Sequence, residues 1–194
     1  MSPPLPRSPE LMSAADAGLL VVDVQEKLVG LIPGHPRIVW NICRLLDAAK
    51  LLGVPAAATE QYPQGLGGTV AELAERLDGI AAKTAFSCGE RGEVIARLQE
   101  AGRDKLLVVG IETHVCVQQT VLDLLAAGSR VYVAVDAVGA RHAIDHDTAL
   151  RRMDSAGATL TTTEAALFEW CQRSDRPEFK EISRLVRESP PDAP

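Results

Sequence analysis

The stretch Gly18-Leu19-Leu20-Val21-Val22-Asp23-Val24 is an uninterrupted apolar run that carries a single carboxylate near its end. A strand covered on both faces does not show the alternation of polar and apolar side chains that a half-exposed strand shows. Such strands belong to parallel sheets that have helices on both sides. The run therefore predicts a buried parallel strand, with Asp23 at its C-terminal end.

Helix-like and strand-like segments alternate about six times along the chain. Further strands are expected over 54–59, 79–82, 105–109, 130–135 and 158–161, and helical segments over 36–52, 70–77, 92–101, 115–127, 146–156, 163–170 and 177–186. This alternation implies right-handed crossovers and helix layers on both faces of one sheet. We predict the α/β class: a three-layer α/β/α sandwich with a six-stranded parallel sheet, Rossmann-like in type.

No linker or internal repeat divides the 194 residues, which are enough for one domain with a substantial core. We expect a single domain over residues 17–187 and a C-terminal tail over 188–194. Residues 1–16 contain Pro and Ser but no apolar signal core, and they are expected to form a flexible N-terminal tail.

The composition argues against several classes of partner. A net charge of -6 without a basic run gives no electrostatic footprint for nucleic acid or for an anionic membrane. No apolar run approaches the roughly 20 residues needed to span a bilayer. We therefore expect no nucleic acid and no membrane as partners.

The four cysteines, Cys43, Cys88, Cys116 and Cys171, lack C-x-x-C spacing. The scattered positions of these cysteines argue against a structural zinc site and against a small disulfide scaffold. A reducing compartment fits best, and we expect a cytoplasmic protein. A disulfide between Cys88 and Cys116 stays open as an alternative.

The loop over 60–69 follows the second expected strand, and loops at this end of a parallel sheet are where such folds bind ligands. Its three glycines match neither a dinucleotide fingerprint nor a phosphate-binding loop, and they indicate turns and a possible lid. No cofactor is expected from this pattern. Glu60 and Tyr62 are candidates for lining a substrate pocket.

Cys116 follows a strand that breaks at Gly110, close to the start of a helix. Unpaired backbone N–H groups and the positive end of the helix dipole favour thiolate over thiol at such a place. Taken alone, the residue has two interpretations, a nucleophile or a small buried hydrophobic side chain.

Asp23, Lys83 and Cys116 all follow apolar strands, and the C-terminal ends of parallel strands meet at one edge of the sheet. Lys83 alone could be a solvated surface residue. If the three side chains lie close together, Lys83 would stabilise the Cys116 thiolate. Asp23 would take the thiol proton and return it to a leaving amine. These residue types are those of a nucleophilic acyl-transfer site.

Three segments carry a family resemblance: residues 21–25 (Val-Val-Asp-Val-Gln), residues 83–87 (Lys-Thr-Ala-Phe-Ser) and residues 110–117 (Gly-Ile-Glu-Thr-His-Val-Cys-Val). They resemble the signatures of the isochorismatase-like cysteine hydrolases, and the similarity runs from about Ala17 to Trp170. Residues 59–67 and 177–181 resemble most closely the subgroup of isochorismatase domain-containing proteins.

The resemblance implies an isochorismatase-like hydrolase fold and a catalytic triad. In it, Cys116 is the nucleophile, Asp23 the general base and then acid, and Lys83 the electrostatic stabiliser. It further implies a cis peptide bond between Ile111 and Glu112. The backbone amides of Glu112 and Cys116 would then form the oxyanion hole.

Two departures within the family narrow the chemistry. Nicotinamidases place histidines after the second strand to hold a metal, whereas this chain has Glu60-Gln61-Tyr62-Pro63 there, so no metal is expected. True isochorismatases cleave a vinyl ether and lack the cysteine. Cys116 therefore indicates hydrolysis of an amide C–N bond, with an ester as the less favoured substrate.

Three other residues are expected to bind substrate, each with an alternative. His114 could touch substrate or relay a proton, or serve only the helix start. Gln25 could hold Asp23 or lie on the surface, and Phe86 could form the pocket wall or pack in the core. His142 and His146 have ligand-compatible spacing, but without a third ligand they fit a solvated helix start better.

Two functions from different classes follow. The first is a metal-independent cysteine hydrolase of a small amide, acting through an acyl-enzyme on Cys116. The alternative is a catalytically idle binding or scaffold protein of the same fold with a redox-sensitive cysteine. The family resemblance also implies a homo-oligomer.

Overall fold

A computed structural model, which describes residues 5–191, contains one six-stranded sheet in the order β3-β2-β1-β4-β5-β6. Every neighbouring pair of strands is parallel. The strands are β1 (Ala17–Val22), β2 (Ala56–Gln61), β3 (Ile80–Lys83), β4 (Lys105–Ile111), β5 (Arg130–Gly139) and β6 (Thr159–Thr161). The predicted three-layer α/β/α class with a six-stranded parallel sheet is confirmed.

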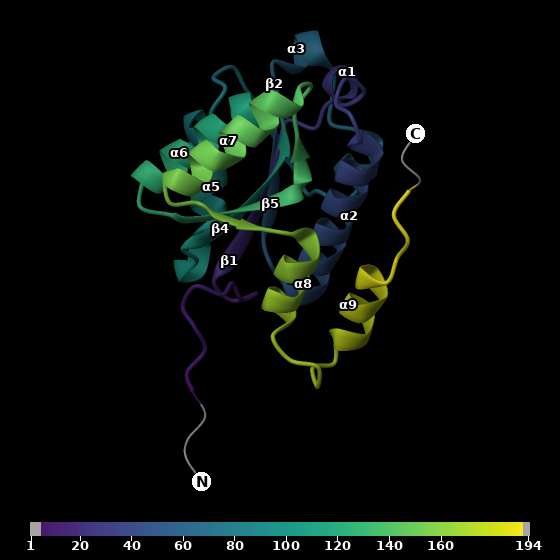
Figure 1. The fold of residues 1–194 in the computed structure, drawn as a ribbon, viewed down its shortest axis with the longest axis vertical. Helices are drawn as coiled ribbons and strands as arrows, with labels where there is room; N and C mark the ends of the chain where they lie inside the picture. Colours follow the sequence, from purple (N-terminus) through teal and green to yellow (C-terminus); the bar gives the residue numbers. More distant parts are fainter. Residues whose placement is uncertain (1–4, 192–194) are drawn as a thin grey trace.

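Helices cover both faces of this sheet (Figure 1). One layer holds α2 (His35–Leu52), α8 (Thr163–Cys171) and α9 (Phe179–Val186), and the other holds α5 (Gly92–Leu98), α6 (Gln118–Ala126) and α7 (Ala143–Ser155). The short helices are α1 (Glu26–Val29), α3 (Pro63–Leu66) and α4 (Ala71–Ala74), with 3-10 turns at Cys88–Glu90 and Glu100–Gly102 and a π-helical turn at Thr113–Val117.

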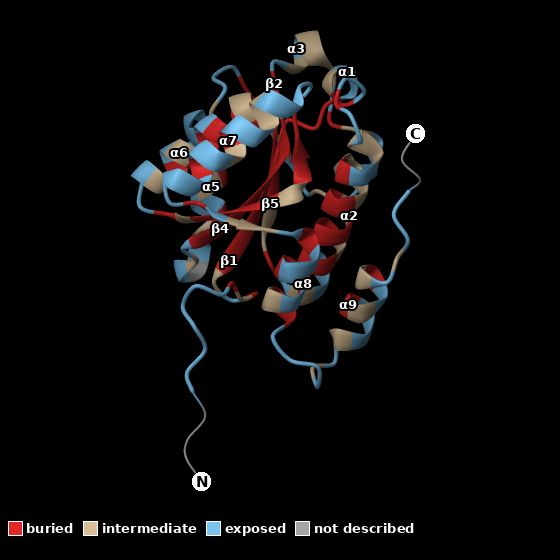
Figure 2. Ribbon diagram, viewed as in Figure 1, coloured by how far each residue is buried: buried red, intermediate tan, exposed pale blue. Residues whose placement is uncertain are grey.

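The apolar run of β1 separates two hydrophobic cores. Leu19 and Val21 pack into the core under α2 and α8, while Leu20 and Val22 pack into the core under α5, α6 and α7. All six residues of β1 are buried, and Figure 2 shows buried strands between helices whose outer faces are exposed. This two-sided burial is the physical reason for the unbroken apolar sequence.

Two strands extend beyond their predicted ends. β2 continues to Gln61 because its register with β3 runs as far as Gln61 and Lys83, so Glu60 and Gln61 belong to the strand and not to the loop. β5 continues to Gly139 because, after a register irregularity, β4 pairs again with Val138 and Gly139.

The segment before β1 is partly fixed to the domain. Met12 is fully buried, and Lys105 Nζ donates to Leu11 O at 2.8 Å and to Asp16 Oδ2 at 2.7 Å. Part of the predicted flexible tail over 1–16, the residues 11–16, thus contacts the domain through a buried apolar side chain and these hydrogen bonds. Residues 1–4 of this tail and residues 192–194 of the C-terminal tail lie outside the described residues.

None of the described helices is both long enough and apolar enough to cross a membrane.

Candidate active site

The structure brings the three predicted catalytic residues to the C-terminal edge of the sheet. Asp23 directly follows β1, Lys83 is the last residue of β3, and Cys116 lies in the π-helical turn after β4. All three residues are buried, with exposed fractions of 0%, 3% and 7%, respectively. Because β1 lies between β2 and β4 and β3 is next to β2, the parallel topology accounts for this convergence.

The Asp23 carboxylate is held at both oxygens. Lys83 Nζ donates to Asp23 Oδ2 at 2.7 Å, and Thr59 Oγ1 donates to Asp23 Oδ1 at 2.8 Å. The backbone of Asp23 is left-handed, with φ of 53°, a region that aspartate tolerates better than most residues. This turn ends β1 and places the carboxylate among its donors.

The Lys83 ammonium is surrounded by oxygen acceptors. Besides Asp23, it donates to Gln61 Oε1 at 2.7 Å, to Phe86 O at 2.8 Å and to Ala85 O at 3.2 Å. A buried charge needs such partners because burial removes its hydration. Lys83 is therefore a buried, hydrogen-bonded member of this cluster and not a solvated surface residue.

Thr59 and Gln61 belong to this site, and the sequence reasoning missed both. They are two residues apart on β2, so their side chains lie on the same face of the strand. Gln61 also donates through Nε2 to Thr84 O at 2.7 Å, which ties β2 to the segment after Lys83. Two polar residues on one face of a buried strand are the sequence signal that would have identified them.

The Cys116 turn is fixed by backbone and side-chain contacts. The peptide bond between Ile111 and Glu112 is cis. Glu112 O accepts hydrogen bonds from Val115 N at 3.1 Å and from Val117 N at 3.3 Å. Thr113 Oγ1 lies 3.0 Å from His146 Nδ1 on α7, so α7 supports the turn from outside the sheet.

The surroundings of Cys116 favour the thiol over the thiolate. Burial, and then the neighbouring Asp23 carboxylate, raise the pKa of Cys116 far above its usual range, and Lys83 opposes this rise without cancelling it. Burial and Asp23 therefore oppose the thiolate-favouring effect that the sequence predicts for the helix start and Lys83. Attack by the sulfur then requires a base, and Asp23 is the carboxylate beside it.

Glu60 and Gln25, both predicted substrate contacts, have hydrogen-bond partners within the protein. Glu60 Oε1 accepts from Thr69 N at 2.6 Å and from Thr69 Oγ1 at 2.8 Å. Gln25 is fully buried, and its amide bonds to both backbone groups of Gln61 and to Gly67 O. The Gln25 side chain makes no hydrogen bond to the Asp23 carboxylate and is not on the surface, because its donor and acceptor groups join β2 to the following loop.

The other expected substrate contacts are more exposed. Tyr62 and Phe86 are 55% and 52% exposed, so neither packs in the core. His114 Nε2 lies 3.9 Å from Asp145 Oδ2, and His114 Nδ1 is buried without a hydrogen-bond partner among the described residues. These three side chains stay candidates for contact with substrate.

All four cysteines are free, so Cys88 and Cys116 are not joined by a disulfide. Among residues 5–191 no group of three or more His, Cys, Asp or Glu side chains is arranged to hold a metal ion. His146, one of the two histidines with ligand-like spacing, bonds Thr113 instead.

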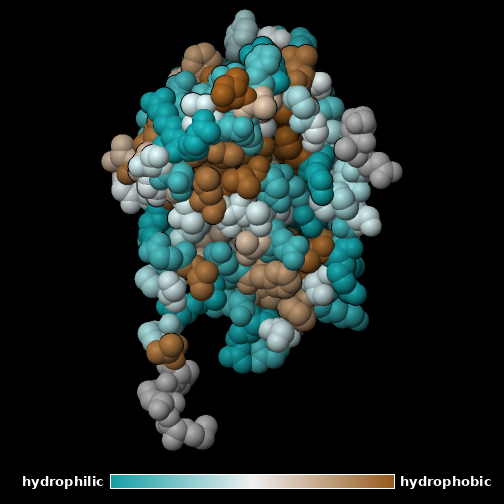
Figure 3. Space-filling model, viewed as in Figure 1, coloured by the Kyte–Doolittle hydropathy of each residue, from teal (hydrophilic) through white to brown (hydrophobic). Residues whose placement is uncertain are grey.

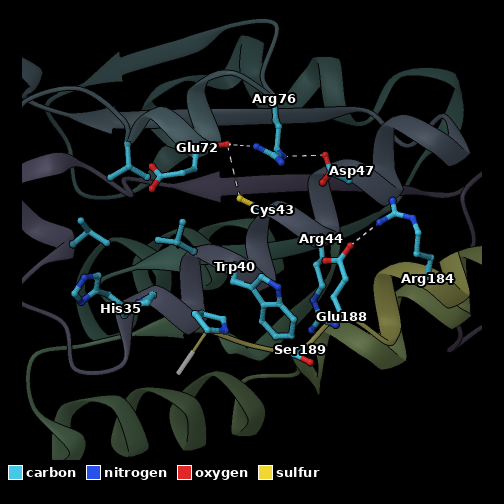
Figure 4. Close-up of a pocket in the computed structure, with 15 residues that line it drawn as sticks. His35, Trp40, Cys43, Arg44, Asp47, Glu72, Arg76, Arg184, Glu188 and Ser189 are labelled. Atoms are coloured by element: carbon cyan, nitrogen blue, oxygen red, sulfur yellow. Dashed lines mark hydrogen bonds and ion pairs between the residues drawn. The ribbon is translucent and has the colours of Figure 1, made fainter. Parts of the chain in front are cut away.

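A large cavity lies apart from the triad. It has a volume of about 910 Å³ and runs between α2, α4 and the C-terminal segment, and Figure 4 shows Cys43, Asp47 and Arg76 along one side. Arg44 stacks over the Trp40 ring at 3.7 Å within it. Its lining includes none of the predicted site residues, and its size alone does not make it the reaction site. A smaller hollow of about 200 Å³ adjoins Lys83 and Tyr62.

Comparison with known proteins gives one consistent result. The family model described as the isochorismatase domain matches residues 17–165. The mouse protein "Isochorismatase domain-containing protein 2A" is 41% identical over 180 residues, which cover 90% of this chain and 84% of that protein.

Solved structures agree with this match. The "MAR1 Ribonuclease" of Caenorhabditis elegans has a TM-score of 0.86 and 42% identity, over 94% of this chain and 95% of that one. The Escherichia coli YcaC gene product, described as an octameric hydrolase of unknown specificity, has a TM-score of 0.84 and 26% identity over 93% and 91% of the two chains.

Proposed function

The chain belongs to the isochorismatase family of hydrolases, and we propose that it hydrolyses a small amide-type C–N bond through an acyl-enzyme on Cys116. The observation that carries this proposal is the placement of a buried thiol against Asp23, whose two oxygens are held by Lys83 and Thr59. A thiol beside an oriented carboxylate is an activated nucleophile with its own base.

The reaction proceeds in two halves. Cys116 Sγ attacks the carbonyl carbon while Asp23 takes the thiol proton, and Asp23 then gives that proton to the leaving amine as the C–N bond breaks. Water next attacks the thioester and loses a proton to Asp23, and the released thiolate takes that proton back. Lys83 keeps Asp23 oriented and balances its charge throughout.

The tetrahedral intermediate of each half carries a negative oxygen. We assign its stabilisation to the backbone N–H groups of Glu112, which directly precedes the π-helical turn, and of Cys116, which lies within it. Preorganised amides in a water-poor site stabilise such an oxyanion strongly, and loss of one donor typically costs about 10²–10³ in rate.

The proposal requires no metal, and the ground for this is the chemistry of the residues near Lys83. The segment over 60–69 contains no histidine, and the carboxylate of Glu60 is engaged by Thr69. The Asp23 carboxylate is already paired with the Lys83 ammonium at 2.7 Å.

The decisive experiment is a screen of an amide library with the wild type and with Cys116→Ala. The expected result is hydrolysis by the wild type and at least a 10³-fold lower rate for the variant, roughly as for the loss of a catalytic nucleophile. Hydrolysis that survives the substitution would exclude the covalent mechanism. The absence of any hydrolysis by the wild type would favour the binding or scaffold role.

A single-stranded RNA in the same screen tests the activity named for the nematode neighbour. The net charge of -6 gives that activity no electrostatic support here.

We further propose that the chain forms a homo-oligomer and acts in the cytoplasm. Several large apolar side chains are exposed, including Leu31 at 58% and Ile144 at 69%, and on the face in Figure 3 hydrophobic residues gather around α7 and β5. Light scattering coupled to size-exclusion chromatography tests the assembly, and a monomer of 20.7 kDa would contradict it. The four free cysteines suit a reducing compartment.

A further inference from the structure

We propose that Thr59 is a positioning residue for the reaction, and that its hydroxyl, which accepts a hydrogen bond from the Cys88 thiol, holds the Asp23 carboxylate in its orientation toward Cys116. This inference rests on the proposed function; it gives Thr59 a role and adds Cys88 to the site.

Thr59 contacts Asp23 twice. Its Oγ1 donates to Asp23 Oδ1 at 2.8 Å, and its carbonyl oxygen accepts from Asp23 N at 3.1 Å. Thr59 is 1% exposed, so water does not compete for either bond. The main-chain bond fixes the backbone of the aspartate, and the hydroxyl bond fixes the rotation of its carboxylate.

The two oxygens of Asp23 therefore have different donors. Lys83 Nζ is 2.7 Å from Oδ2, and Thr59 supplies Oδ1. With one charged and one neutral donor, the carboxylate is held in one plane and cannot turn without breaking a buried bond. The base then does not have to reorient when Cys116 loses its proton.

The Cys88 thiol contacts the Thr59 hydroxyl. Its Sγ lies 3.3 Å from Thr59 Oγ1, and its backbone N donates to Thr120 Oγ1 at 2.9 Å, which fixes the cysteine in place. A threonine hydroxyl has one hydrogen, and here it goes to the carboxylate, which can only accept. The thiol of Cys88 is consequently the donor to Thr59, and a chain runs from Cys88 through Thr59 to Asp23.

A chain of this kind strengthens its last bond, because each donor polarises the next. It also requires that Cys88 stays protonated, and burial raises the pKa of this thiol, which agrees with that requirement. The titratable groups that face Asp23 are Lys83 from β3, Cys88 from the 3-10 turn and Cys116 from the turn after β4.

The test measures the alkylation rate of Cys116 by iodoacetamide against pH, with each cysteine resolved by mass spectrometry. Asp23 must be ionised to act as a base, so the wild-type rate is expected to fall at acidic pH, and Asp23→Asn is expected to remove this acid limb. The readout needs no knowledge of the substrate.

In Thr59→Val the hydroxyl donor is lost while the shape of the side chain is kept. Removing a hydrogen bond to the charged form favours protonation, so the acid limb is expected to move to higher pH by about one unit. Thr59→Ser keeps the donor and is expected to restore the wild-type profile. Cys88→Ala is expected to give a smaller shift in the same direction.

The matched control is Thr163→Val. Thr163 is also fully buried, and its hydroxyl donates to an aspartate, Asp136 Oδ1, at 3.0 Å. The same change there removes the same kind of bond without touching Asp23, so the acid limb is expected to stay in place. If Thr59→Val does not fold, as judged by circular dichroism, Thr59→Ala removes the same donor with less bulk.

The outcomes separate the two proposals. An Asp23-dependent limb that does not move in Thr59→Val overturns the role of Thr59 and leaves the proposed function intact. A wild-type profile without an Asp23-dependent limb overturns both. A shift that Thr163→Val reproduces shows a general loss of packing and also overturns the role of Thr59.

Discussion

Lys83 Nζ lies 2.7 Å from Asp23 Oδ2, and neither side chain has any exposed surface. Sixty residues of sequence separate the two groups. A pair of this kind is weak evidence for stability in itself, because both charges lose their hydration. Its importance lies in what happens when one partner is removed, since the other charge is then left buried and uncompensated.

We predict that Lys83→Met lowers the free energy of unfolding by about 3–5 kcal/mol, since it leaves the Asp23 carboxylate buried without its counter-charge. Urea denaturation followed by circular dichroism measures the loss. Lys105→Met is the comparison: Lys105 pairs with Asp16 at the same distance of 2.7 Å, but the Asp16 side chain is 34% exposed. The loss there is expected to be about 1 kcal/mol. Equal losses of unfolding free energy in the two variants would show that removing Lys83 carries no added penalty from a buried, unpaired Asp23.

Gly110→Ala is expected to prevent normal folding of the edge that carries Cys116. Gly110 has φ of 118°, and a Cβ built on it would lie 2.1 Å from Val22 O, a backbone atom of the neighbouring strand. Gly157→Ala is the matched control, because Gly157 has φ of 108° but no atom within 4 Å of the added Cβ. The control is expected to lose only about 1–2 kcal/mol from the backbone conformation. Melting temperatures of the two variants give the comparison, and similar values would refute the clash.

The raised pKa of Cys116 predicts a loss of stability at alkaline pH. Because the folded-state value lies above the unfolded value of about 8.5, the contribution is complete below that pH and is lost as pH rises toward the folded-state value. The stability difference between wild type and Cys116→Ala is expected to shrink from about pH 7 to about pH 10, as measured by urea denaturation. A difference that stays constant over this range would show that the thiol is not perturbed.

The lowered pKa of His146 predicts a loss of stability at acidic pH. Burial disfavours the charged ring, and the nearby Asp147 opposes this only in part. The contribution is present above the unfolded value of about 6.5 and is lost as pH falls through the folded-state value. We expect His146→Asn to lose less stability than the wild type on acidification, by thermal melts across this range. His142→Asn, at the exposed start of α7, serves as control and is expected to follow the wild type.

Much of the fold could be predicted from local sequence. The unbroken apolarity of β1 follows from burial on both faces, and this property is visible in a single segment. The alternation of strands and helices then leaves few topologies, because crossovers are right-handed. The residues at strand ends, Asp23, Lys83 and Cys116, could be identified for the same reason.

The ends of strands and the partners of side chains could not be predicted in this way. The polar residues Glu60 and Gln61 predict a loop, but they are the last residues of β2. They stay in the strand because they pair with Ala82 and Lys83 of β3. Gln25 was expected at the substrate or on Asp23, and it instead bonds the backbone of Gln61 and Gly67.

The sequence by itself determined the parallel sheet and the edge where Asp23, Lys83 and Cys116 meet, because hydrophobic patterning and chain direction are local properties. Only the tertiary structure decided that Thr59 and Lys83 hold Asp23, and that burial beside Asp23 raises the pKa of Cys116. Hydrogen-bond partners and desolvation depend on atoms from distant segments. The position of Cys116 near a helix start predicts a lowered pKa, whereas burial beside the Asp23 carboxylate raises the pKa.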